Sequence, residues 1–149
     1  MYSDSRVIDL VTRHFVPVRV HAVQNRDTFA TLGERFNAQW TPTILIVDAA
    51  GHERHRIEGF LPADDFLSQL ALGVAKAAFA RKDYASAERL YREVIDRYAK
   101  TDAAPEAQYW AGVSRYRATN DPSALKDTAK AFADRYNEST WATKASIWK

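Results

Sequence analysis

The hydrophobic pattern of this chain changes along its length, and this change restricts the fold more than any other feature. In the first 60 residues, helical patterns alternate with runs of β-branched and aliphatic residues, and residues 43–47 form a continuous apolar run typical of a buried strand. From about residue 62 onward the apolar spacing is helical throughout. The sequence therefore predicts a small part of mixed helices and strands, followed by an all-helical region.

The first part has an interpretable order of elements. The pattern predicts a helix over residues 5–14, a strand over 15–22, and a second helix that begins at Asn25 or Asp27 and ends near Asn37. The apolar run at 44–47 and the segment 52–59 flank a turn signal, Asp48-Ala-Ala-Gly51, and are predicted to form a β-hairpin. A further helix is expected to open at Pro62, where proline and acidic residues favour a helix start.

The second part is predicted to contain helices over residues 70–82, 84–99, 104–118, 122–136 and 141–149, separated by short polar breaks. It also repeats itself. The pattern that begins at Asp83 and ends in Asp-Arg-Tyr98 recurs 38 residues later, from Asp121 to Asp-Arg-Tyr136. A pair of helices cannot bury its apolar face alone, so such repeats are expected to stack on a neighbour.

Charge divides the chain at nearly the same point. Residues 1–70 carry 7 Arg against 9 Asp and Glu, and residues 71–149 carry 14 Lys and Arg against 10 Asp and Glu, for a total of +2. This asymmetry indicates a boundary between domains at residues 1–70 and 71–149. It lacks the clustered basic stripe of a nucleic-acid-binding surface, so no nucleic-acid partner is expected.

The chain contains no cysteine. It therefore carries no disulfide, no zinc-binding thiolate and no redox thiol. His52 and His55 lie three apart in a predicted strand and point to opposite faces, so they are not expected to share a metal. No motif for a metal or another cofactor is present. The apolar runs are too short to span a bilayer and the start lacks a secretory pattern, which predicts a cytoplasmic protein with no membrane partner.

Four segments of the first part resemble the thioredoxin-like family: residues 15–20, the Trp40-Thr-Pro-Thr43 step into an apolar strand, the turn at 48–51, and residues 56–60. The resemblance implies an incomplete thioredoxin-like fold with a cis bond between Thr41 and Pro42. The backbone at Thr41 and Pro42 is then a candidate peptide-binding site, because relatives pair an extended substrate with it. The family's first strand and its Cys-x-x-Cys segment have no counterpart here. Either the protein has lost them, or the sequence is the C-terminal fragment of a thiol-disulfide oxidoreductase whose redox segment lies upstream.

The missing strand leaves two alternatives for the sheet. The strands at 15–22 and 43–47 could pair directly in parallel, through a right-handed crossover that contains the second helix. Alternatively, a second chain could fill the gap, which predicts a possible homodimer.

The second part resembles tetratricopeptide-type hairpins, through Gly73-Val74, the segment 83–98, and a second copy suggested by residues 105–116 and Phe132. The resemblance implies a groove that binds other proteins, with Lys76, Gln108 and Arg115 as candidate groove residues. The sequence thus favours a non-catalytic binding module or scaffold for a protein or peptide. The fold class expected is a mixed α+β thioredoxin-like part followed by an all-α region.

Overall fold

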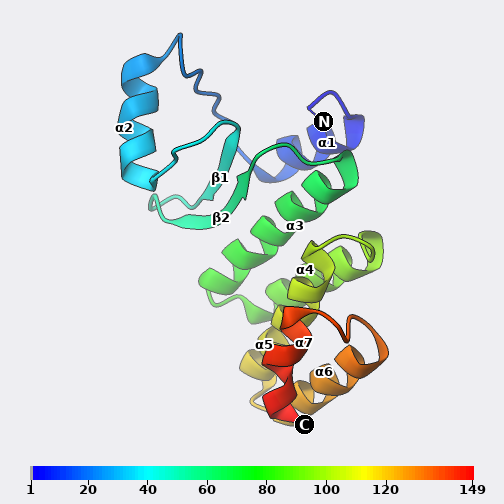
Figure 1. Cartoon of the computed structure of the whole chain (residues 1–149). Helices are drawn as coiled ribbons and strands as arrows, with labels where there is room; N and C mark the ends of the chain where they lie inside the picture. Colours follow the sequence, from blue (N-terminus) through cyan, green and yellow to red (C-terminus); the bar gives the residue numbers. More distant parts are fainter. Residues whose placement is uncertain (1) are drawn as a thin grey trace.

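The computed structural model describes residues 2–149 (Figure 1). A part with two helices and one hairpin precedes a region made only of helices. In chain order the elements are α1 (Ser5–His14), α2 (Arg26–Phe36), β1 (Thr43–Val47), β2 (Glu53–Glu58), α3 (Ala63–Ala80), α4 (Tyr84–Arg97), α5 (Ala103–Thr119), α6 (Ser123–Asp134), α7 (Thr140–Ala145) and a short 3₁₀ helix η1 (Ser146–Trp148).

The hairpin is held in shape by the side chain of Asp48. Its Oδ1 accepts hydrogen bonds from the backbone N–H groups of Ala50 and His52, both at 2.9 Å, while Arg54 donates to Oδ2. These bonds hold the pKa of Asp48 well below its usual range. Gly51 closes the turn with φ at +84°, a conformation that glycine adopts at little cost. β1 and β2 then pair antiparallel, with Ile44 opposite Ile57.

The strand predicted over residues 15–22 is absent, and this expectation was wrong. The segment is irregular, and the side chains of Val16 and Val18 are 93% and 81% exposed. Within residues 2–149 the sheet has only the two strands β1 and β2, so the direct parallel pairing considered above does not form. The β propensity of such a segment reflects packing against a neighbouring strand, and no strand lies beside it here.

Helix α3 corrects a second expectation. The sequence pattern predicted two helices, whereas the structure has one continuous helix over Ala63–Ala80. The helix is continuous because no glycine-proline break interrupts it and its apolar residues continue through Leu70 and Leu72. The boundary placed between residues 70 and 71 therefore falls inside a helix. α3 nevertheless contributes to two clusters of buried residues, and the change from one to the other occurs between Leu70 and Leu72, while the partly buried Tyr98 packs against both clusters.

The first core lies between α1, the hairpin and the N-terminal half of α3. Its buried members are Val7, Ile46, Ile57, Phe66, Leu67 and Leu70. At Gly73 the helix passes so close to the hairpin that an added Cβ would collide with the side chain of Ile46 and lie 3.3 Å from Cβ of His55. A residue without a side chain thus allows α3 to approach β2 closely.

The second core joins α3, α4 and α5 and is rich in alanine. Buried members are Leu72, Ala75, Ala78, Ala87, Tyr91, Val94, Ile95, Ala103, Ala107 and Ala111. Asp83 caps α4 by accepting from the backbone N–H of Ser86 at 3.3 Å. Lys82 and Asn120 have positive φ at the turns after α3 and α5, which lets α4 and α6 fold back on the preceding helices. The region therefore consists of two helical hairpins, α3–α4 and α5–α6, followed by α7.

Candidate functional site

The five residues singled out in the sequence do not form one site. Thr41 and Pro42 are exposed in the loop before β1, where the bond between them is cis and the carbonyl of Pro42 accepts from the N–H of Gly59 at 2.8 Å. Trp40 and Phe60 flank this loop and are 71% and 73% exposed. The other three residues, on α3 and α5, lie apart from this loop.

Of these three, Lys76 lines a groove. The groove has a volume of about 260 Å³ and is formed by β2, α3, α5 and α7, with Tyr91 of α4 at its floor. We call it the α3–α5 groove, and its lining consists of Glu53, Arg54, Lys76, Phe79, Ala80, Tyr91, Glu106, Trp110 and Trp141. It lies where the hairpin meets the helical region.

Gln108 and Arg115 lie outside this groove. Gln108 is two residues beyond Glu106, which places it roughly 200° around the helix axis. Arg115 is directed toward α6, where its guanidinium lies 3.3 Å from Asp127. Both residues occupy the side of α5 that faces away from this groove. Their assignment as peptide-binding residues stays a prediction.

A chain of polar contacts borders the groove and connects β2 to both helices. Nζ of Lys76 lies 2.7 Å from Oε1 of Glu106 and 3.1 Å from Nδ1 of His55, and Nε2 of His55 lies 2.7 Å from Oε1 of Gln69. An amide oxygen can only accept, so Nε2 must carry the proton and Nδ1 accepts from the Lys76 ammonium. The contacts thus select the neutral imidazole with its proton on Nε2.

The pKa of His55 agrees with this assignment. Burial lowers it, and the neighbouring Lys76 ammonium lowers it further, while the hydrogen bond to Gln69 and the charge of Glu106 act in the opposite direction. Burial also raises the pKa of the Tyr91 hydroxyl, with a smaller contribution from Glu106. The groove therefore combines one fixed ion pair with a neutral histidine and a neutral tyrosine.

Aromatic side chains form the remaining wall. The ring of Phe79 meets that of Trp110 edge to face, with centroids 5.2 Å apart. Tyr109 contacts Trp110 on one side and Trp141 on the other, at 5.4 and 5.3 Å. It also stacks on Trp148 at 4.7 Å, which fixes η1 against α5. The tryptophans that border the groove are thus held in place by neighbouring rings.

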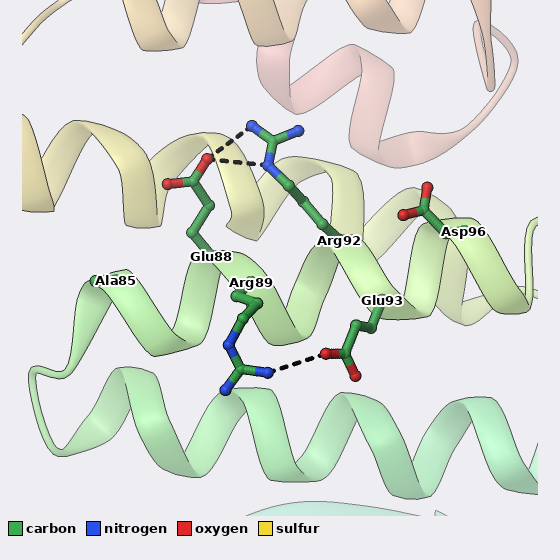
Figure 2. Close-up of a pocket in the computed structure, with 6 residues that line it drawn as sticks. All are labelled: Ala85, Glu88, Arg89, Arg92, Glu93 and Asp96. Carbon is green, nitrogen blue, oxygen red and sulfur yellow. Dashed lines mark hydrogen bonds and ion pairs between the residues drawn. The ribbon is translucent and has the colours of Figure 1, made fainter.

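A second depression on the outer face of α4 lacks these features (Figure 2). Its charged side chains all come from that one helix, and four of them form two ion pairs, Arg89 with Glu93 at 2.9 Å and Arg92 with Glu88 at 2.7 Å. Exposed pairs of this kind contribute a few tenths of a kcal/mol and are common on solvated helices. We therefore assign no site to it.

Comparison with known proteins gives one match. Residues 1–73, just under half of the chain, match the family model described as a thioredoxin-like domain. This match supports a thioredoxin-like domain in the first part of the chain. No curated protein and no solved structure matches the chain. The family match ends inside α3, and the tetratricopeptide-like interpretation of residues 71–149 stays a prediction.

The thioredoxin-like domain contributes His55, Glu53 and Arg54 to the border of the groove, and the sequence pattern did not point to any of them as binding residues. Glu106 and Trp110 were missed as well, although their spacing of four places them on one face of α5. Among residues 2–149 no helix is long and apolar enough to cross a membrane.

Proposed function

We propose that this protein is a protein- or peptide-binding module and that the α3–α5 groove is its binding surface. The observation that supports this most directly is the combination of a half-buried ion pair with a rigid aromatic wall in one concave surface. Lys76 and Glu106 keep 26% and 20% of their side-chain surface exposed, so a ligand can reach them although bulk water is partly excluded.

The ion pair presents complementary groups to a peptide bond. The Lys76 ammonium has three N–H groups, of which His55 and Glu106 take two. The third can donate to a peptide carbonyl, while the free oxygen of the Glu106 carboxylate can accept from a peptide N–H. A donor and an acceptor side by side in a partly dry groove fit the backbone of an extended segment.

The aromatic wall indicates which side chains the segment carries. Trp110 and Trp141 border the groove, and tryptophan is over-represented where proteins contribute most to binding free energy. The formal charges on the lining cancel, because it contains two acidic residues, Glu53 and Glu106, and two basic residues, Arg54 and Lys76. We therefore expect a ligand with an aromatic or large aliphatic side chain and no requirement for net charge.

Selection of peptides from a random displayed library tests this proposal. Selected peptides are expected to share an apolar anchor residue and to bind the purified chain in fluorescence polarisation. Glu106→Gln and Trp141→Ala are expected to weaken binding about tenfold or more, equivalent to roughly 1.4 kcal/mol. Gln108→Ala and Arg115→Ala are the control variants, because both residues lie on α5, as Glu106 does, but outside the groove.

The proposal fails if the groove variants bind as well as the wild type, or if Gln108→Ala and Arg115→Ala weaken binding equally. Thermal unfolding of each variant distinguishes a lost contact from a lost fold. The alternative function is that these residues are the C-terminal part of a thiol-disulfide oxidoreductase. It requires a thiolate nucleophile from an upstream Cys-x-x-Cys segment, because the 149 residues contain no cysteine.

A further inference from the structure

The two edges of the sheet are chemically different. β2 presents charged residues along its length, Glu53, Arg54, Arg56 and Glu58, and such residues protect an exposed edge from pairing with another strand. β1 has the sequence Thr-Ile-Leu-Ile-Val and carries no charge, proline or lysine. A strand of this composition is typical of a position buried between two other strands. In residues 2–149, however, it has a neighbour on only one side.

The backbone of β1 leaves a defined set of groups available. The carbonyl of Pro42 accepts from the N–H of Gly59, and the N–H of Asp48 donates to His52, so the even-numbered residues of this segment face β2. Because hydrogen-bonding direction alternates along a strand, Thr43, Leu45 and Val47 direct their N–H and C=O groups to the opposite edge.

Exposed apolar side chains collect in the same part of the chain. Eight of the nine exposed large hydrophobic residues lie within residues 2–60: Tyr2, Ile8, Val16, Val18, Val23, Trp40, Val47 and Phe60. α2 also has no buried residue, although its side chains include Phe29, Leu32 and Phe36. Trp40 and Phe60 flank the hairpin, and aromatic side chains can each bury roughly 150–250 Å². This is a substantial share of the approximately 800 Å² per partner that a standard interface buries.

We propose that two copies of this chain associate through the open edge of β1, which joins the two hairpins into one four-stranded antiparallel sheet. The interface is independent of the α3–α5 groove. A twofold axis passes beside Leu45, so Leu45 lies opposite its counterpart, and Thr43 lies opposite Val47 of the second copy. All outward N–H and C=O groups of these three residues are then paired in both copies.

The strand is complementary to itself in this register, which is the reason a second copy is the occupant. Ile44 lies opposite Ile46 of the second copy, on the face of the sheet that α3 covers, and apolar pairs of this kind stabilise adjacent strands. Shifted registers with the same symmetry would leave outward groups of Thr43 or Val47 unpaired. No like charges oppose one another, because β1 has no charged residue.

The absence of cysteine provides a sharp test, since any introduced thiol is the only one in the chain. Directly opposite, hydrogen-bonded residues have Cα atoms about 5.5 Å apart, within the range that a disulfide bridges. Leu45→Cys is therefore expected to form a covalent dimer under mild oxidation. In Val47→Cys the thiols of the two copies lie four residues apart along the sheet, about 13 Å, so no disulfide-linked dimer is expected. Thr43→Cys combined with Val47→Cys restores cross-linking should Leu45→Cys fail to fold.

Sedimentation equilibrium of the wild type at micromolar concentrations completes the test. The expected mass of the wild type is twice 16.9 kDa. Cross-linking is expected for Leu45→Cys, and it is not expected for Val47→Cys or for Glu58→Cys, the control at the edge of β2. Val47→Lys, on an exposed side chain, is expected to weaken association at least tenfold while preserving the circular dichroism spectrum. A wild-type mass of 16.9 kDa, a dimer that none of the β1 cysteines cross-links, or equal cross-linking by Glu58→Cys would overturn the proposal.

Discussion

Replacing Gly112 with alanine tests how closely α5 and α6 approach. Gly112 is buried on α5 and faces Thr128 of α6. An added Cβ would lie 2.8 Å from both Cβ and Cγ2 of Thr128 and closer still to its Oγ1. Thr128 cannot easily rotate away, because its side chain is β-branched and its hydroxyl donates to the carbonyl of Ala124 at 2.7 Å. The helices themselves must therefore separate.

Two effects of opposite sign determine the magnitude. Alanine is favoured over glycine inside a helix by about 0.8–1.0 kcal/mol. Overpacking of a well-packed core costs about 1–3 kcal/mol, and three contacts to one β-branched side chain place this substitution at the upper end. We expect Gly112→Ala to lower the free energy of unfolding by about 2 kcal/mol, which corresponds to a decrease of roughly 4–8 °C in Tm for a chain of this size.

Urea denaturation of the variant, compared with the wild type, measures this loss. The background variant Thr128→Ala removes Oγ1 and Cγ2, so the cost of Gly112→Ala is expected to be less than half as large in that background. If Gly112→Ala were as stable as the wild type or more stable, α5 and α6 would not be in the close contact described here.

Two further predictions concern His55 and the cap of α4. The pKa of His55 is lowered in the folded protein, so the unfolded chain binds more protons below about pH 6.5, and the free energy of unfolding should fall as the pH drops through that value. His55→Gln should reduce this dependence, and Lys76→Met should raise the His55 pKa in NMR titrations; an unchanged pKa would show that Lys76 does not contact the ring. Asp83→Ala removes the bond to the N–H of Ser86 and should cost about 1 kcal/mol in urea denaturation. Asp102→Ala, at a helix start without such a bond, should cost less, and equal losses would argue against the cap.

The elements that the sequence predicted correctly depend on local signals. The spans of α1 and α4 follow from nearby aspartate caps and regular apolar spacing, and the hairpin follows from the Asp48 turn. The failures depend on distant contacts. Residues 15–22 have strand propensity, but a strand also needs a neighbour, and no neighbour forms within this chain. The division of α3 into two predicted helices is an exception, because no break lies near residue 70 and the apolar positions continue through Leu70 and Leu72.

The groove could be predicted only in small part for the same reason. Lys76 was inferred from the helical repeat, whereas His55 and Glu106 lie 21 and 30 residues away from it and meet it only through the packing of β2 and α5 against α3. Gln108 and Arg115 were inferred from the tetratricopeptide-type resemblance, which places a groove along the first helix of each pair and does not specify the face of α5 that borders the α3–α5 groove. Side chains two positions apart point to nearly opposite sides of a helix.

The continuity of α3 has a consequence for the thermodynamics of the whole chain. Its 18 residues form a rod about 27 Å long, and the two cores lie on successive segments of that rod. Loss of helical structure at one end deprives the other core of part of its wall, so the free energies of unfolding of the two parts are coupled. Cutting the polypeptide after residue 73, where the thioredoxin-like match ends, would divide the helix and leave Leu70 close to a frayed terminus. Sequence homology and cooperative folding therefore divide this protein at different places.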